Sequence, residues 1–249
     1  MKKKISVTII AKNAQKTLFE CLKSVERFDE VILLDNQSSD DTLKIAREFS
    51  NVKVYQSEFI GFGALKNLAI SYAKNDWILS LDSDEVVEED LLNEIENLNF
   101  ELGKYYSFSR KNYFHGKWVK CCGWYPDRVK RIFNKTEIGY REKLVHEGLQ
   151  TGKAKEIKLK GSVKHYTMEN IDNILSKMNR YTSLSAKEMK ERGKRGSAIG
   201  GIGRFVFVFV KDYFFRMGWR YGYRGFVIAW CNASGAMFKY LKLYEMEQK

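Results

Sequence analysis

The first hundred residues alternate short, mostly apolar runs with stretches in which apolar residues recur every three or four positions. Runs of four to seven apolar or β-branched residues are typical of strands in a buried sheet, and the three-to-four spacing predicts amphipathic helices. The strand-like segments are 5–11, 30–34, 52–55 and 77–82, with helix-like segments between them. The order β-α-β-α-β-α-β predicts an α/β fold whose parallel sheet is of the nucleotide-binding type.

The fourth apolar segment ends in three carboxylates within four positions, at Asp82, Asp84 and Glu85. Ligands of open α/β sheets bind outside the carboxyl ends of the strands, so we expect Asp82 and Asp84 to face a ligand. Carboxylates this close repel unless a cation lies between them, and Mg²⁺ is typically held by one or two carboxylates and substrate phosphates. The pattern predicts a divalent metal, Mg²⁺ or Mn²⁺, on a diphosphate; a solvated acidic loop before a helix is the alternative.

Asp35 ends the second strand-like segment, so it is expected at the same edge of the sheet, where its carboxylate can accept hydrogen bonds from a ribose or a base. Lys66 and Asn67 stand at the start of a helix behind Gly61 and Gly63, where backbone amides and side-chain donors can meet the same ligand. The alternative is that both are ordinary exposed residues of a first helical turn.

Composition and charge divide the chain. Residues 1–100 contain about 12 basic and 18 acidic side chains, whereas the remainder contains 31 basic and 13 acidic ones, within a total of +12. A basic, aromatic-rich second half without a nucleic-acid motif favours an anionic membrane over nucleic acid as partner. The four cysteines fit neither a disulfide framework nor a zinc site, and no signal-peptide pattern follows Met1, so we expect an intracellular protein.

The C-terminal part predicts a helix over residues 170–192, followed by alternating aromatic and basic residues from Phe205 to Arg224. Its uncharged run, 225–238, covers about fourteen residues, fewer than the roughly twenty needed to cross a bilayer. The pattern predicts a segment that lies in the membrane interface. Packing of these aromatic residues against the rest of the chain or a partner subunit is the alternative.

Four blocks within the first ninety residues resemble the inverting family 2 glycosyltransferases, which have the GT-A fold. They are I-S-V-T-I-I-A-K-N at 5–13, L-D-N-Q-S-S-D-D-T at 34–42, G-F-G-A-L-K-N-L-A-I at 61–70 and L-D-S-D-E at 81–85. The resemblance implies a GT-A-like nucleotide-binding sheet with flanking helices. Asn36 departs from it, because many members have there a second Asp that contacts uracil, which leaves the identity of the nucleotide open.

The segments W-Y-P-D-R-V-K-R-I-F-N-K at 124–135 and V-H-E-G-L at 145–149 resemble a bacterial subgroup that builds the inner core of lipopolysaccharide. That resemblance implies transfer of a sugar, glucose by analogy, from a nucleotide-diphosphate sugar such as UDP-glucose to a core acceptor such as heptose. The alternatives are another surface polysaccharide or glycolipid as acceptor, or a nucleotidyltransferase. We expect a lipid-linked acceptor, no nucleic acid, and a cytoplasmic, peripheral location on the cytoplasmic face of the inner membrane.

Inversion by one displacement needs a general base beside the acceptor hydroxyl and charge neutralisation on the departing diphosphate. Glu147 is the first candidate for the base, and Asp127 is the second or a residue that orients the acceptor. Arg128 and Arg131 are expected to clamp phosphates, with a solvated edge strand as the alternative.

The metal is assigned to Asp84, Asp82 and His146. The nucleotide sugar is assigned to Ala11, Asn13, Asp35, Asn36, Lys66, Asn67, Asp82, Ser83, Arg128 and Arg131. Residues 1–160 are expected to form the catalytic domain, and 161–249 a helical, membrane-contacting region.

Overall fold

A computed structural model describes residues 4–141, 148–168 and 170–248. The described residues form two compact units. The first draws on residues 1–110 and 128–165, and the second on residues 111–127 and 166–249. The second unit thus includes a segment from the middle of the chain as well as the C-terminal helices. Each unit is described by itself.

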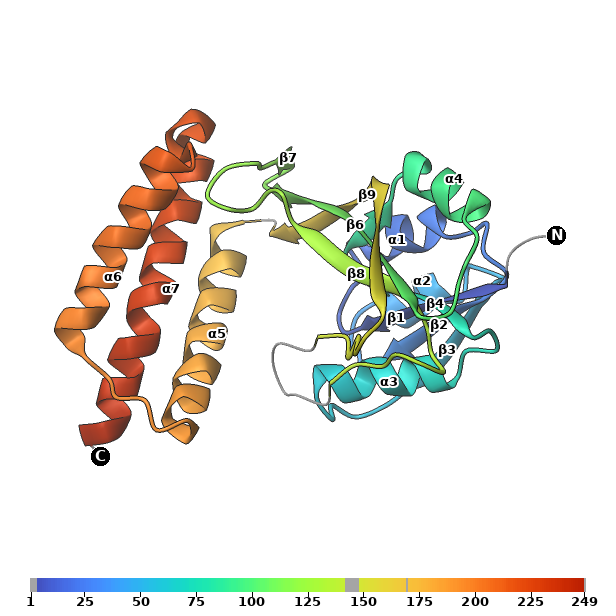
Figure 1. The fold of residues 1–249 in the computed structure, drawn as a ribbon, viewed down its shortest axis with the longest axis horizontal. Helices are drawn as coiled ribbons and strands as arrows, with labels where there is room; N and C mark the ends of the chain where they lie inside the picture. The colour runs from blue at the N-terminus through green and yellow to red at the C-terminus, as the bar shows by residue number, and fades with distance from the viewer. Residues whose placement is uncertain (1–3, 142–147, 169, 249) are drawn as a thin grey trace. The chain divides into compact units, whose positions relative to one another are not determined.

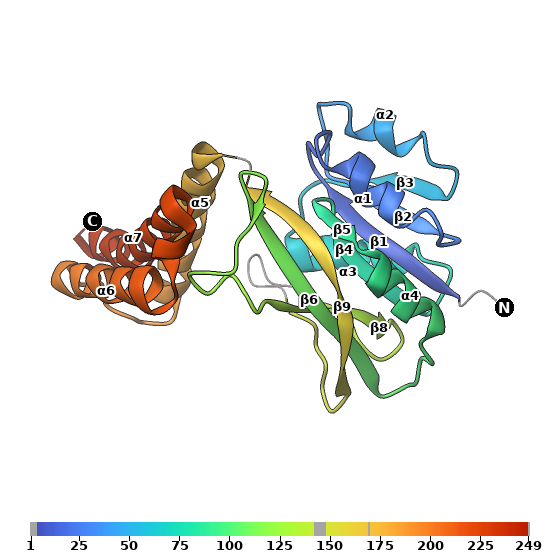
Figure 2. The same cartoon turned by 90° about the horizontal axis from the view of Figure 1, so that it is seen from above.

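The parallel half of the sheet in the first unit follows the predicted alternation of strands and helices (Figures 1 and 2). Its strands are β1 (Ile5–Ala11), β2 (Val31–Asp35), β3 (Val52–Gln56) and β4 (Trp77–Asp82). They lie in the order β3-β2-β1-β4, with all neighbouring pairs parallel. The intervening helices are α1 (Leu18–Ser24), α2 (Thr42–Ala46) and α3 (Phe62–Ser71). The predicted α/β sheet with flanking helices is confirmed.

An antiparallel half continues the same sheet beyond β4 in the order β8-β6-β9-β5. These strands are β5 (Glu85–Val87), β6 (Lys104–Phe114), β8 (Arg128–Asn134) and β9 (Lys155–Met168), and helix α4 (Glu89–Asn97) follows β5. Strand β8 pairs with β4 on one side and β6 on the other. The alternative of a solvated edge strand for this stretch holds only in part, because β4 covers one edge of β8 at residues 132–134, and Arg131 is buried whereas Arg128 is exposed.

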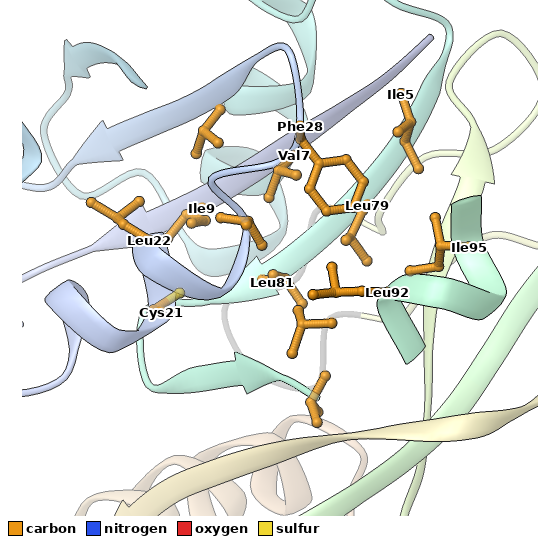
Figure 3. Packing of buried hydrophobic residues seen from close by; sticks show 14 of the residues in the cluster. Ile5, Val7, Ile9, Cys21, Leu22, Phe28, Leu79, Leu81, Leu92 and Ile95 are labelled. Carbon is orange, nitrogen blue, oxygen red and sulfur yellow. The ribbon is translucent and has the colours of Figure 1, made fainter. Parts of the chain in front are cut away.

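The core of the first unit explains why the strands read as uninterrupted apolar runs. Figure 3 shows Ile5, Val7 and Ile9 of β1 packing with α1, β4 and α4. All five residues of β2 are buried, as expected for a strand that is covered on both faces of the sheet. The parallel strands are therefore buried, and polar side chains that meet a ligand are expected at their carboxyl ends.

The second unit is mainly helical. Its helices are α5 (Ile171–Glu191), α6 (Ala198–Val210) and α7 (Gly222–Gln248), with a π-helical turn (Lys211–Phe215) and a 3₁₀ turn (Gly218–Tyr221) between the last two. Helix α7 packs against both α5 and α6. The Asn170 side chain caps α5 by accepting a hydrogen bond from the Asn173 amide (2.9 Å), in agreement with the predicted start of this helix.

The segment 111–127 joins this unit through a hairpin of β6 with β7 (Lys117–Trp118). Its residues Phe114, Val119, Cys121 and Cys122 share a hydrophobic cluster with α5 and α7. Among the described residues, no helix is both long enough and apolar enough to cross a membrane.

Candidate functional site

The strand register brings the predicted donor-binding residues to one edge of the sheet. Ala11, the last residue of β1, lies opposite Asp35 at the end of β2, and Ile10 lies opposite Asp82 at the end of β4. Asp35 and Asp82 are therefore on either side of β1, two interstrand spacings or about 10 Å apart. The expectation that both carboxylates reach the same edge agrees with this register.

Asp35 and Asn36 are buried at the start of the loop that follows β2. The Asp35 carboxylate accepts hydrogen bonds from the Ser38 amide (3.1 Å) and the Gln56 side-chain amide (3.3 Å). Asn36 donates its side-chain amide to the Ser57 carbonyl (3.0 Å) and its backbone amide to the Ala11 carbonyl (2.7 Å). Hydrogen bonds thus hold together the carboxyl ends of β1, β2 and β3 and the loops that follow them.

Asn13 extends this arrangement to the loop after β1. Its side-chain oxygen accepts a hydrogen bond from the Ser39 amide (2.9 Å), and its own amide donates to the Ser38 hydroxyl (2.9 Å). Its φ of 50° lies in the left-handed region, which asparagine tolerates better than most residues. Ala11, Asn13, Asp35 and Asn36 therefore belong to one connected loop cluster.

The Asp82 carboxylate is held by two cationic side chains. Lys66 Nζ lies 3.0 Å from Asp82 Oδ1, and Arg131 Nη2 donates to Asp82 Oδ2. Both cations are buried, whereas the Asp82 side chain is 30% exposed. We expected the repulsion among the carboxylates to need a metal ion; the structure shows that protein cations also relieve it.

Glu85 connects the members of this cluster. Its fully buried carboxylate accepts hydrogen bonds from Arg131 Nη2 (2.9 Å), Arg110 Nη1 (3.2 Å) and the Asp82 amide (3.1 Å). One side chain thus fixes both the backbone of the acidic turn and the arginine that contacts Asp82. Sequence reasoning counted Glu85 among the three carboxylates but gave it no role, and it did not identify Arg110.

These contacts set the ionisation of the cluster. Burial alone would raise the pKa of Asp82, but Arg131 and Lys66 more than offset it and hold that pKa well below its usual range. Burial opposes the charge of Arg131, yet Asp82 and Glu85 raise the pKa of Arg131 well above its usual value. The edge therefore presents fixed charges of both signs at neutral pH.

Asp84 and Ser83 lie in the turn between β4 and β5, and both are half-buried. His165, which faces Glu85 in the antiparallel register of β5 with β9, places its Nε2 3.3 Å from Asp84 Oδ2. Sequence reasoning missed His165, because it lies eighty residues away and only the strand pairing brings it to the acidic turn. In the parts of the chain that the structure describes, no three His, Cys, Asp or Glu residues form a metal-binding group.

The donors of the acidic turn fit a divalent ion that arrives with a diphosphate. Asp84 offers a carboxylate and His165 an imidazole, whereas both oxygens of Asp82 already face Lys66 and Arg131. Mg²⁺ usually takes only one or two protein carboxylates and completes its coordination with phosphate oxygens and water. Asp84 with His165 is therefore the pair that fits such an ion.

Asn67 is engaged by the backbone of the segment after β8. Its side-chain oxygen accepts from the Tyr140 amide (2.8 Å), and its amide donates to the Tyr140 carbonyl (3.0 Å). Lys66 Nζ lies 5.2 Å from the centre of the Tyr140 ring. The contact of Asn67 with a nucleotide sugar stays a prediction, and its visible role is to attach Tyr140 to α3.

The predicted base, Glu147, and His146 lie outside the described residues, but the chain on either side of them is described. Arg141 donates its amide to the Gly148 carbonyl (3.0 Å), and Tyr140 forms a β-bridge with Leu149. The described residues that flank 142–147, Arg141 and Gly148, therefore meet next to Tyr140, whose ring contacts Lys66 of the Asp82 cluster.

The remaining candidates are Arg128 and Asp127. Arg128 donates to the backbone carbonyls of Ser107 (2.7 Å) and Leu159 (2.9 Å), and so connects β8 to β6 and β9. Asp127 belongs to the second unit, where its Oδ2 accepts a hydrogen bond from Asn112 (3.0 Å).

Comparisons with known proteins identify the family. Residues 6–139 match the family described as glycosyl transferase family 2. An uncharacterized glycosyltransferase of Rickettsia typhi is 29% identical over 260 residues, which cover 99% of this chain and 89% of the relative. The lipopolysaccharide core biosynthesis glycosyltransferase LpsC of Rhizobium meliloti is 26% identical, covering 97% of this chain and 92% of LpsC.

Among solved structures, residues 1–349 of S. aureus TarS superimpose with a TM-score of 0.48 and 20% identity, covering 72% of this chain and 64% of that one. The family match spans more than half of the chain and includes the four sequence blocks on which the predicted resemblance rests. The chain therefore belongs to glycosyl transferase family 2 and is a glycosyltransferase.

Proposed function

We propose that this glycosyltransferase moves a sugar, glucose in the first instance, from UDP-glucose to a lipopolysaccharide or lipooligosaccharide core acceptor such as heptose, with inversion. The observation that carries the proposal is the convergence of Asp35 and the Asp82–Asp84 turn on one sheet edge of a family 2 member. The acceptor class is supported by LpsC, a relative over nearly the whole chain whose name assigns it to lipopolysaccharide core biosynthesis.

The donor is proposed to lie along this edge. Asp35 and Asn36 are placed to accept and donate hydrogen bonds at a ribose and a base, and the Asp82 turn is placed at the diphosphate. The interval of about 10 Å between β2 and β4 is on the scale of a nucleoside diphosphate. Lys66 and Arg131 keep Asp82 ionised and bring positive charge to the side on which the diphosphate negative charge develops.

A divalent metal, Mg²⁺ or Mn²⁺, is proposed to be held by Asp84 and His165 together with diphosphate oxygens. When bound, it would neutralise charge on the departing diphosphate. His165 joins His146, which the sequence assigned to the metal, as a candidate ligand, because its Nε2 lies 3.3 Å from Asp84 Oδ2.

Glu147 is proposed as the base that accepts the proton of the acceptor hydroxyl. The support is that Arg141 and Gly148, the described residues on either side of 142–147, meet beside Tyr140, which contacts Lys66 of the Asp82 cluster. Asp127, held by Asn112 in the second unit, is proposed to orient the acceptor.

The second unit is proposed to bind the anionic cytoplasmic face of the inner membrane, where a lipid-linked acceptor is found. Its 101 residues contain 18 Lys or Arg against 8 Asp or Glu, a net charge of +10. Ile199, Ile202, Val206 and Val210 recur at three- and four-residue intervals along α6, and all four are exposed. An exposed apolar stripe on a basic unit fits an anionic bilayer surface.

A thermal-shift screen of nucleotide sugars, with and without Mg²⁺ or Mn²⁺, tests the donor. A donor that binds only the folded protein raises the melting temperature, and we expect UDP-glucose with metal to give the largest shift. Transfer is then measured with deacylated core oligosaccharides and with other surface glycans as acceptors. A larger shift with another nucleotide sugar would replace the donor, and transfer only to other glycans would replace the acceptor.

Flotation with anionic liposomes tests the membrane surface. The double variant Ile202→Asp/Val206→Asp places two charges on the α6 stripe, and we expect it to weaken liposome binding at least tenfold because apolar burial is replaced by charge. The matched control is Leu102→Asp, which adds a charge at an exposed leucine of the first unit. Equal binding by all three proteins would contradict this surface.

A further inference from the structure

The hairpin of β6 with β7 holds a tryptophan between two lysines. Its two-residue turn, His115 and Gly116, has positive φ at both positions (47° and 71°), the type I′ geometry that matches the twist of paired strands. The register places Trp118 opposite Tyr113. Because residues two apart in a strand share a face, Lys111 and Lys120 extend from the same side as Trp118, and Lys117 from the opposite side.

The segment after β7 is held by buried side chains and by hydrogen bonds within the second unit. Val119, Cys121 and Cys122 are buried in the cluster that also contains α7 residues. The Cys122 amide donates to the Arg216 carbonyl (3.1 Å), and Asn232 of α7 donates its side-chain amide to the Cys122 carbonyl (3.2 Å). The platform that carries Trp118 is therefore fixed before any ligand arrives, which lowers the entropic cost of binding.

Two ammonium groups gather around the Trp118 indole. Lys120 Nζ lies 3.9 Å and Lys111 Nζ 5.1 Å from the indole centre, and the Tyr125 ring meets it edge-on at 5.4 Å. The cation–π attraction holds both ammonium groups at the ring, so two positive charges lie beside the indole, where they attract an anion.

The polar groups beside the lysines add capacity for hydroxyl and acid groups. Among the residues that the structure describes, Trp118 Nε1 is buried without a hydrogen-bond partner, which is costly for an N–H donor. Asn112, which accepts the Val119 amide (3.0 Å), also holds the carboxylate of Asp127 (3.0 Å), a group able to accept hydrogen bonds from sugar hydroxyls. Cations, an aromatic ring and a carboxylate on one rigid segment are the components of a site for an acidic sugar.

We propose that Lys111, Lys120 and Trp118 form a subsite for an anionic sugar, one that bears a phosphate or carboxylate, in the acceptor. The proposal rests on the proposed function, because it places an acidic sugar of the acceptor on the second unit. The lysines supply charge and the hairpin supplies position, so the subsite selects the acceptor and takes no part in the chemical step.

Titration of the full chain, labelled with ¹⁵N at its tryptophans, tests the subsite without requiring transfer. The probes are mannose 6-phosphate, glucuronic acid, mannose and inorganic phosphate, and the Trp118 indole signal is identified by its loss in Trp118→Phe. We expect saturable shifts of this signal with the two acidic sugars, none with mannose and weaker ones with inorganic phosphate. Lys120→Gln and Lys111→Gln should each weaken binding about fivefold, whereas the control Lys117→Gln should leave it unchanged.

Kinetics provide the second measurement. With a phosphorylated core oligosaccharide as acceptor, Lys120→Gln should raise the acceptor KM about fivefold and leave kcat and the donor KM unchanged. An unshifted Trp118 signal with both acidic sugars, or equal affinities in Lys120→Gln and Lys117→Gln, would overturn the subsite. Shifts of the expected pattern in a chain that transfers no sugar to any core acceptor would retain the subsite and refute the proposed function instead.

Discussion

Two buried carboxylates, Glu30 and Glu85, lie at opposite ends of the strands of one sheet. Glu30 precedes β2 at the amino end, where it accepts hydrogen bonds from the Ser6 hydroxyl (2.5 Å), the Lys74 amide (2.8 Å) and Lys53 Nζ (2.9 Å). Glu85 follows β4 at the carboxyl end and binds Arg110, Arg131 and the Asp82 amide. Both satisfy the requirement that a buried charge be paired and hydrogen-bonded.

Glu30 and Glu85 differ in which further residues their hydrogen-bond partners contact. The described partners of Glu30 are a hydroxyl, a backbone amide and an ammonium group at the amino end of the sheet. Those of Glu85 lead on to Asp82, and through the turn to Asp84 and His165. Because ligands of parallel sheets bind at the carboxyl ends, loss of Glu85 should affect donor binding, whereas loss of Glu30 should affect stability alone.

The largest effect is expected from Asp84→Ala. Removing the carboxylate proposed to hold the metal should lower the transfer rate about a thousandfold, because charge on the departing diphosphate is no longer neutralised. Initial rates at saturating acceptor, with circular dichroism to verify folding, provide the measurement. Asp90→Ala, an exposed carboxylate of α4, is the control. A folded Asp84→Ala variant of normal activity would contradict the assignment of the carboxyl edge as the site.

Glu147→Gln should lower kcat by about two to four orders of magnitude, the usual contribution of a general base, while the donor-induced thermal shift persists. Glu20→Gln, on the exposed side of α1, serves as the control. An unchanged kcat would remove Glu147 from the mechanism, and a parallel measurement on Asp127→Asn would then identify the second candidate.

Glu85→Gln should lower the free energy of unfolding by about 3 kcal/mol, because it leaves the buried guanidinium of Arg131 with less compensating charge. It should also weaken donor binding at a temperature where the variant is fully folded, since the Asp82 amide and Arg131 lose their shared acceptor. Urea unfolding and donor titration provide the two numbers. Loss of stability with unchanged donor affinity would make Glu85 equivalent to Glu30 and abolish the contrast between the two ends.

Glu30→Gln should cost about 2 kcal/mol of stability at pH 7 and leave transfer per folded molecule unchanged. Burial raises the pKa of Glu30, but hydrogen bonds from Ser6, Lys53 and the Lys74 amide more than offset this and lower it. A lowered folded-state pKa stabilises the protein above the unfolded-state value of about 4.3, and this stabilisation is lost as the pH falls through the folded-state pKa. The stability difference between wild type and Glu30→Gln should therefore shrink below about pH 4. A difference independent of pH would contradict the ionic role of Glu30.

The parallel half of the fold was predictable because its signals are local. The first strand, Ile5–Ala11, is a run of mostly apolar and β-branched residues, and the end of β4 follows from the change from apolar residues to carboxylates. Asp35 and Asp82 were placed on one edge by the rule for parallel strands. The helix expected between the first two strand-like segments is short in the structure, Leu18–Ser24, because the residues on either side form turns.

What depends on pairing between distant strands was not predictable. His165 and Arg110 reach the acidic turn only through the antiparallel strands β9 and β6, and nothing in their local sequence specifies those partners. Sequence analysis gave the four cysteines no structural role, yet Cys121 and Cys122 are buried in a cluster with α7 residues, within the second unit that includes 111–127. A single expected domain boundary at residue 160 cannot represent a unit that also takes in residues 111–127 from the middle of the chain.

The pairing of Asn67 with Tyr140 and the hydrogen bond from Arg141 to Gly148 are made by residues outside the stretch 142–147. Substitutions within 142–147 should therefore leave the attachment of Tyr140 to α3 intact, so that a loss of transfer in such a variant reports on the substituted residue and not on a displaced Tyr140.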